Sequence, residues 1–204
     1  MAGLLITIEG IEGAGKTTLA AALAERLRSR GNEVVVTSEP GGGPIGERIR
    51  RILLDPSNSI TDRAELLLFE AARAQHVETL IRPALERGAV VICDRYTDSS
   101  IAYQGAARGL GTEAVRQLND FATGGLRPDL TILLDLPAQD GLARQSRVDR
   151  VSSEGQAFHE AVRQGFLEAA KAEPDAFVVI DASKPFQLVV EEAVEAVFSI
   201  RSAG

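Results

Sequence analysis

Residues 4–18 read "LLITIEGIEGAGKTT" and join an apolar run to a glycine-rich loop. The run LLITIE is short and rich in β-branched side chains, which predicts a strand. After the loop, apolar residues recur with the period of one helix side: Leu19, Leu23 and Leu27. The loop satisfies the pattern G-x-x-x-x-G-K-[ST], whose fixed positions are Gly10, Gly15, Lys16 and Thr17. A strand before this pattern and a helix after it are the context that identifies a phosphate-binding loop.

The chemistry of this loop predicts a nucleoside triphosphate as ligand. Glycines let the backbone wrap closely around phosphate oxygens, while the loop amides and the helix N-terminus point at the anion. Lys16 adds a positive charge, and the Thr17 hydroxyl is a ligand for Mg²⁺. We therefore expect a nucleoside triphosphate and Mg²⁺ to bind here, with the nucleotide contacted by Gly10, Ile11, Glu12, Gly13, Ala14, Gly15, Lys16, Thr17 and Thr18.

The rest of the chain alternates strand-like and helix-like segments. Further apolar runs are EVVVTSE, AVVICD, LTILLDL and AFVVIDA, each separated from the next by a stretch of helical period. This pattern predicts an α/β protein of the P-loop NTPase fold, with a five-stranded parallel sheet covered by helices on both faces. A second helix is expected to present Ile45, Ile49, Ile52 and Leu53, and Asp62 with Glu65 resembles a capping box at the start of a third.

Length and composition predict a single domain over residues 1–204, with 45% apolar residues. The net charge of −7 disfavours a nucleic-acid or anionic-membrane partner and favours a small ligand. We find no signal peptide and no apolar stretch long enough for a membrane span, so a cytoplasmic location is expected. The single cysteine, Cys93, lies in a strand-like run and is interpreted as a buried thiol.

A polar segment, RQSRVDRVSSEG, is predicted to form a small mobile lid at about residues 144–155. An ordinary surface loop is the competing interpretation.

The phosphate loop leaves several functions open. A GTP-dependent switch would carry D-x-x-G and N-K-x-D stretches, and neither occurs. A small-molecule kinase needs a second anion site facing the loop, and Arg95, just after the run AVVICD, is placed to supply it. A P-loop ATPase or regulatory protein that acts on a protein partner is the alternative from another class.

Four motifs resemble the thymidylate kinase family of the bacterial type: GIEGAGKTT, EPGG, FEAARAQHVE and DRYTDSSIAYQGAARGLG. The resemblance runs from the first strand to the helix containing FHEAVRQGF. It implies transfer of the γ-phosphoryl group of ATP to dTMP, giving dTDP and ADP, by a homodimeric enzyme. A kinase for another nucleoside or nucleoside monophosphate is the alternative.

The resemblance also implies a role for each matching residue. Phe69 would stack on thymine and Arg73 would hydrogen-bond its O4 edge, while Tyr103 would crowd the 2′ position of the sugar. Arg95 would touch the acceptor phosphate and the transferring phosphoryl group. Further acceptor contacts are implied for Ser100, Gln104, Pro40, and Arg48 or Arg50. Ser38 and Gly43 depart from the arginine and threonine found at these positions in many relatives.

Glu12 is unexpected in a loop built for anions, because like charges repel. We interpret it as part of the acceptor pocket, and the resemblance implies a hydrogen bond from the 3′-OH of the monophosphate. The alternative is a glutamate that points into solvent.

Members of the family that this chain resembles carry the catalytic cation either in the phosphate loop or in the lid. Ile11 to Ala14 contain no basic residue, so the resemblance implies that the lid supplies it. The resemblance favours Arg147 and Arg150, supported by Arg144, and their spacing of three would align them on a helical turn. A solvated charged face is the alternative. Asp135, at the end of LTILLD, suits either a metal shell or a turn cap.

Overall fold

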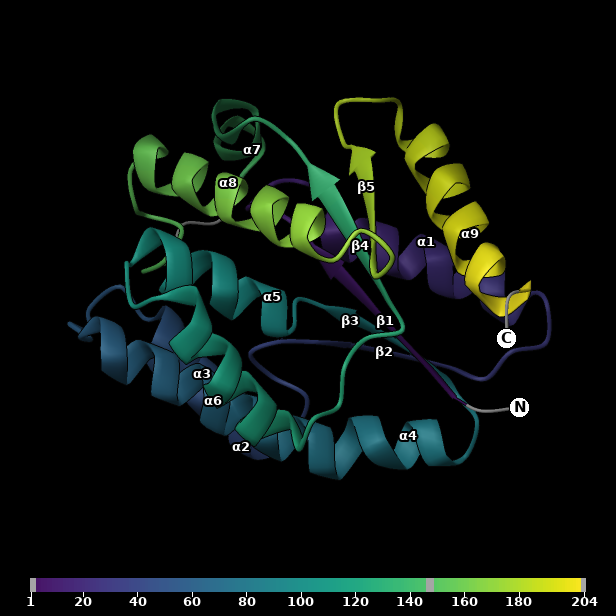
Figure 1. The fold of residues 1–204 in the computed structure, drawn as a ribbon, viewed down its shortest axis with the longest axis horizontal. Helices are drawn as coiled ribbons and strands as arrows, with labels where there is room; N and C mark the ends of the chain where they lie inside the picture. The colour runs from purple at the N-terminus through teal and green to yellow at the C-terminus, as the bar shows by residue number, and fades with distance from the viewer. Residues whose placement is uncertain (1–2, 146–148, 203–204) are drawn as a thin grey trace.

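The computed structural model describes residues 3–145 and 149–202, the last two by their backbone alone, and contains one five-stranded parallel sheet (Figure 1). The strands lie in the order β2-β3-β1-β4-β5. Their bounds are β1 Leu4–Glu9, β2 Val34–Ser38, β3 Val90–Asp94, β4 Leu130–Asp135 and β5 Phe177–Asp181. Each strand coincides with one of the five apolar runs, so the predicted α/β fold class is confirmed.

The central strand β1 explains why both faces of the sheet carry helices. It pairs with β3 on one side and β4 on the other, with Ile6 opposite Ile92 and Leu130. Successive side chains of a strand point to opposite faces. Ile6 accordingly packs into one hydrophobic cluster and Leu5 into another, both without exposure.

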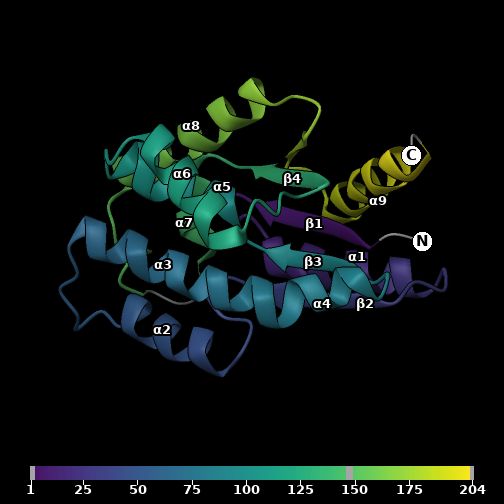
Figure 2. The same ribbon diagram turned by 60° about the horizontal axis from the view of Figure 1, so that its bottom comes forward.

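The helices flank this sheet on both sides. On one side α1 (Lys16–Arg28) packs against α9 (Phe186–Ser202). On the other side α8 (Gln156–Ala172) packs against the π-helical segment η2 (Ile101–Ala107). The same side as α8 carries one nearly continuous helical arm, which runs lengthwise across Figure 2. That arm consists of α3 (Asp62–His76), η1 (Val77–Ile81, also π-helical) and α4 (Arg82–Glu86). The remaining helices are α2 (Pro44–Leu54), α5 (Thr97–Ser100), α6 (Thr112–Thr123) and α7 (Ala138–Arg144).

The second predicted helix is present as α2, where Leu53 is buried and Ile45 and Ile52 are 45% and 47% exposed. The predicted capping box at the start of α3 is wrong. Helix α3 begins after Thr61, which makes no side-chain capping bond. Glu65 is buried and binds arginines from elsewhere in the chain instead of capping the helix, because long-range ion pairs compete with local capping.

The lid region is ordered by contacts with α2 in its described part. Arg144 ends α7, and residues 150–153 form turns in which Val151 and Ser152 are buried. The backbone N–H of Arg150 donates to the carbonyl of Leu54. Arg144 and Arg150 therefore do not share a helix, contrary to the alignment expected from their spacing, and Arg147 lies outside the described residues.

Among the described residues, no helix combines the length and apolar character that crossing a membrane requires.

Candidate active site

One cavity of about 800 Å³ opens at the carboxyl ends of the central strands. In parallel sheets this is the edge at which ligands bind. The cavity is lined from both sides by residues that the sequence singled out, including Glu12, Lys16, Thr17, Phe69, Arg95 and Tyr103. Phe69 thus borders open space, with volume for more than one ring system.

The phosphate loop depends on glycines at its crowded points. Gly10 and Gly13 have φ of 141° and 73°, a region that favours glycine. A Cβ at Gly10 would lie 2.6 Å from the carbonyl oxygen of Leu134, and one at Gly13 would meet the carbonyl of Gly141 at 2.0 Å. The loop can therefore press against β4 and α7 only with glycine at both positions.

Lys16 is held inside this loop. Its Nζ donates to the carbonyls of Gly10 (3.0 Å) and Ile11 (2.7 Å). Burial, followed by the nearby positive charge of Arg95, lowers the pKa of Lys16 to about 8. The site therefore holds a lysine whose charge is poorly compensated, which favours an anion beside it.

Thr17 and Asp94 bring two oxygen ligands together. The Thr17 hydroxyl donates to Oδ2 of Asp94 over 2.5 Å, and both residues line the cavity. A hydroxyl and a carboxylate are ligands that suit Mg²⁺. The donor set fits the predicted ion, and Asp94 is a member that the sequence analysis missed although it ends a strand next to Arg95.

Arg95 connects the loop to the second half of the cavity. Its Nη1 donates to the Gly10 carbonyl (3.1 Å), and its Nη2 donates to Glu12 Oε1 (3.0 Å) and to the Tyr103 hydroxyl (3.0 Å). Arg95 has φ of 71°, a strained value for a non-glycine residue. Burial opposes its charge, but surrounding groups, Tyr103 and Glu12 among them, raise the pKa of Arg95 above its usual value. It remains a permanent cation in the cavity.

Glu12 turns into the protein, so the solvent-pointing alternative is wrong. Its Oε1 accepts from Arg95 and from the Tyr103 hydroxyl (2.6 Å), and Nδ1 of His159 lies 3.0 Å from Oε2. Burial alone would raise the pKa of Glu12, but Arg95, His159, Lys16 and Tyr103 together hold it well below the usual range. Glu12 is thus a carboxylate that remains ionised at neutral pH, and His159 is a neighbour that no sequence pattern indicated.

Phe69 and Arg73 occupy the same side of α3 but lie at different depths. Phe69 lines the cavity, whereas Arg73 is 1% exposed and is not among the lining residues. Nε of Arg73 donates to Glu39 (2.8 Å) and Nη1 donates to the Ser100 hydroxyl (2.9 Å). Further partners of the guanidinium are Glu70, Asn119 and the Tyr96 carbonyl. Arg73 therefore stands behind Ser100, with most of its donors engaged by the protein.

Ser100 and Gln104 border the cavity as expected, from α5 and η2. Nε2 of Gln104 donates to Oε1 of Glu65 (2.7 Å), which fixes the orientation of its amide.

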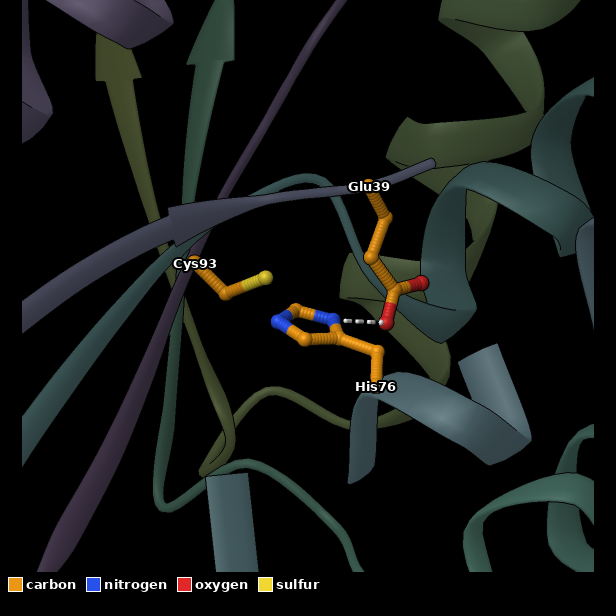
Figure 3. Close-up of side chains that lie close together, drawn as sticks. All are labelled: Glu39, His76 and Cys93. Carbon is orange, nitrogen blue, oxygen red and sulfur yellow. Dashed lines mark hydrogen bonds and ion pairs between the residues drawn. The ribbon is translucent and has the colours of Figure 1, made fainter. Parts of the chain in front are cut away.

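A buried cluster of three polar side chains contacts Arg73 through Glu39. Glu39, His76 and Cys93 place one ligand atom each within 4.8 Å of one another (Figure 3). These atoms already have partners: Nδ1 of His76 contacts Glu39 Oε1 (2.9 Å), Nε2 contacts the Thr37 hydroxyl (2.7 Å), and the Cys93 thiol donates to the Arg95 carbonyl (3.0 Å). Burial raises the pKa of Cys93, which keeps the thiol protonated. The cluster is a hydrogen-bonded support for Glu39 and Arg73, and Cys93 is the buried thiol that the sequence predicted.

Basic residues from two other segments line the cavity. Arg50 lines it and donates to the Pro40 carbonyl (2.8 Å), while Arg48 is exposed, which favours Arg50 of the two candidates. Arg144 also lines the cavity and donates to the Ala182 carbonyl (3.2 Å).

Arg150 and Asp135 are each engaged in an ion pair. Arg150 donates to the Leu53 carbonyl (2.7 Å) and to Glu65 Oε2 (2.6 Å), and it is not among the residues that line the cavity. The Asp135 carboxylate accepts hydrogen bonds from Nε (2.7 Å) and Nη2 (3.0 Å) of Arg163. Both of its carboxylate oxygens thus serve this ion pair.

Comparisons with known proteins agree with this geometry. Residues 8–193 match the family model described as thymidylate kinase. The thymidylate kinase of Pseudomonas fluorescens strain Pf-5 is 56% identical over 193 residues, covering 93% of this chain and 92% of that protein. That of Latilactobacillus sakei strain 23K is 52% identical, with 97% and 95% covered. A crystal structure of thymidylate kinase from Ehrlichia chaffeensis has a TM-score of 0.80 and 34% identity, covering 97% and 99%. The chain therefore belongs to the thymidylate kinase family of ATP-dependent nucleoside monophosphate kinases.

Proposed function

We propose that this enzyme transfers the γ-phosphoryl group of ATP directly to the 5′-phosphate of dTMP, giving dTDP and ADP for dTTP synthesis. A single observation supports this best. One cavity joins the phosphate loop to Phe69, and Arg95 lies between the two halves with bonds to Gly10 and Glu12. Two nucleotides bound with their phosphates facing Arg95 would occupy it, and no covalent enzyme intermediate is needed.

The donor half consists of residues 10–18, which hold the ATP phosphates, with Arg144 at the rim. Thr17 and Asp94 would hold Mg²⁺, which neutralises phosphate charge and orients the phosphates when bound. Lys16 contributes a positive charge that its burial leaves poorly compensated.

The acceptor half reads the base and the sugar. Phe69 stacks on thymine, with Gln104 and Ser100 beside the ring. Arg73 acts at the O4 edge from its position behind Ser100, to which it is bonded. Glu12 accepts a hydrogen bond from the 3′-OH, and Tyr103 crowds the 2′ position.

Cations then offset the charge of the transferring group. Pro40 and Arg50 approach the acceptor phosphate. Arg95 contacts both phosphoryl groups, and the lid arginines, Arg147 and Arg150, close over them. Arg150 would have to leave Glu65 to do so, because its guanidinium is engaged there in this structure. We also propose that the enzyme works in the cytoplasm as a homodimer.

The proposal is tested by ADP release in a coupled assay across dTMP, dUMP, dCMP, dGMP and no acceptor. We expect turnover to be highest with dTMP and negligible without a monophosphate. A preference for dCMP would contradict the base assignment and favour a kinase of another nucleotide. ATP turnover that needs no monophosphate would favour the ATPase or regulatory alternative.

A further inference from the structure

His159 is a buried polar side chain for which the reaction as described has no use. It lies in the first turn of α8 and is fully buried. Among the described residues, neither of its ring nitrogens makes a hydrogen bond of ordinary geometry. A buried imidazole is normally hydrogen-bonded, because an unpaired polar group in the interior is costly. The side chain therefore calls for an explanation other than packing.

His159 lies against the carboxylate of Glu12. Nδ1 lies 3.0 Å from Oε2, within ion-pair distance although off the direction of a well-formed hydrogen bond. The other oxygen, Oε1, is already bonded to Arg95 and to the Tyr103 hydroxyl. A carboxylate oxygen offers only lone pairs, so this approach is attractive only when Nδ1 carries a proton.

Aromatic contacts fix the imidazole in this place. The Phe158 ring meets the His159 ring edge-on, with centroids 5.6 Å apart, and it meets the Tyr103 ring at 6.1 Å. The backbone N–H of His159 donates to the Gly155 carbonyl, at the end of the lid segment (3.3 Å). Tyr103 and His159 therefore reach Glu12 from two different elements, η2 and α8.

We infer that His159 is a positioning residue: through Nδ1–H it holds Oε2 of Glu12, so that the carboxylate is fixed from both sides for the 3′-OH of the acceptor nucleotide. This rests on the proposed contact between Glu12 and the 3′-OH. A freely rotating carboxylate would lose orientation entropy on binding the sugar, and a fixed one does not. His159 thereby links the helix that follows the lid to recognition of the sugar.

The kinetic test compares dTMP with 3′-deoxy-dTMP, which lacks the 3′-hydroxyl whose hydrogen bond Glu12 would accept. His159→Phe keeps a ring in place but removes Nδ1. We expect kcat/KM for dTMP to fall about tenfold, the size of one lost hydrogen bond to a charged group. With 3′-deoxy-dTMP the fall should be less than about twofold. The KM for ATP should stay unchanged, and His159→Asn, which restores a donor near the Nδ1 position, should recover most of the loss.

Val162→Ala is the matched control, because Val162 is a fully buried apolar residue on the same helix. This variant should lower kcat/KM by about the same factor with dTMP and with 3′-deoxy-dTMP. If His159→Phe affects both acceptors equally, or neither, the inference is wrong. Glu12→Gln separates this outcome from failure of the sugar assignment: if that variant also treats both acceptors alike, the contact between Glu12 and the 3′-OH is what fails.

A measurement on the unaltered protein covers the case in which the phenylalanine variant does not fold. The chain has only two histidines, so the ¹⁵N signals of the imidazole rings can be assigned with one His76 variant. We expect Nδ1 of His159 to be protonated and its signal to move when dTMP is added. A proton found only on Nε2 would set a lone pair against Glu12 and would overturn the inference.

Discussion

At the scale of single residues, the cavity is a set of charges that compensate one another incompletely. Arg95 and Lys16 both lie beside Glu12. The burial that destabilises each charge also strengthens the attraction of each cation for the Glu12 carboxylate. The pKa of Lys16 is lowered while that of Arg95 is raised, because only the arginine has close carboxylate and hydroxyl partners. The two cations should therefore respond differently to pH.

The lowered pKa of Lys16 predicts a pH dependence of ATP binding. Below pH 8 the free enzyme holds a charged Lys16, and above pH 8 the neutral form prevails. The dissociation constant for ATP should therefore rise by up to about tenfold per pH unit above 8, levelling off when phosphates stabilise the charge in the complex. Titration calorimetry from pH 7 to 9.5 measures it, with dTMP as the control ligand. An ATP affinity that is flat across this range would contradict the prediction.

The buried position of Arg73 predicts two separable effects of Arg73→Ala. The KM for dTMP should rise while ATP binding stays nearly intact, because the guanidinium supports only the acceptor half. Stability should fall by about 3–5 kcal/mol, because Glu39 and Glu70 lose a buried partner. Steady-state kinetics and thermal unfolding measure the two effects.

Lys171→Ala is the control for Arg73→Ala, since Lys171 forms an exposed ion pair with Glu168. It should leave the KM for dTMP and the KM for ATP unchanged, and it should lower the stability by no more than about 1 kcal/mol. A KM for dTMP that is unchanged in Arg73→Ala would remove the base contact from the proposal.

At the scale of elements, Glu65 ties the lid to the acceptor pocket. Its Oε2 accepts from Arg150 (2.6 Å) and Arg108 (3.2 Å), while its Oε1 accepts from Gln104. Helix α3, which carries Glu65, also carries Phe69. Lid movement that frees Arg150 would therefore alter the charge balance next to the base-reading residues.

Removal of a lid arginine should depress turnover. Arg150→Ala is expected to lower kcat at least tenfold, because a cation that neutralises transferring charge acts mainly on the chemical step. The same holds for Arg147→Ala. Arg108→Ala is the matched control, since Arg108 shares Glu65 but is placed outside the reaction. It should lower the melting temperature and leave kcat nearly unchanged. If Arg150→Ala behaves like this control, Arg150 is an anchor of the lid and has no catalytic role.

At the scale of the whole molecule, exposed apolar side chains lie on α2, α3 and α6, of which α3 packs against the other two. They are Ile45 and Ile52 of α2, Leu67 of α3, and Phe121 of α6, which is 89% exposed. Figure 2 shows these helices together on one side of the sheet. Large exposed apolar patches mark interaction surfaces, which supports the proposed homodimer.

Phe121→Asp should therefore weaken self-association. We expect the dimer dissociation constant to rise by about a hundredfold or more, because the substitution places a charge where an aromatic ring would be buried. Analytical ultracentrifugation measures it. Leu188→Asp is the control, since Leu188 is 46% exposed on α9, away from these helices. Equal dimerisation in both variants, or a wild-type monomer, would contradict the prediction.

The sequence alone determined the sheet, the phosphate loop and the family. Apolar period and glycine spacing are local properties, and they fix which segments become strands and where the loop must turn. Because strands of a parallel sheet end at one edge, the sequence also placed residues 12 and 95 at one site, and the family resemblance added residues 69 and 103.

Only the tertiary structure decided how charged side chains pair. His159 beside Glu12, Asp94 beside Thr17, and Glu65 with Arg150 are contacts between residues 77 to 147 positions apart. No local pattern encodes them, because each depends on where two elements come to lie after packing. The same long-range pairing took Glu65 away from the helix cap and drew the guanidinium of Arg73 behind Ser100. A buried charge takes the partner that the fold brings nearest, and that distance is a property of the folded chain.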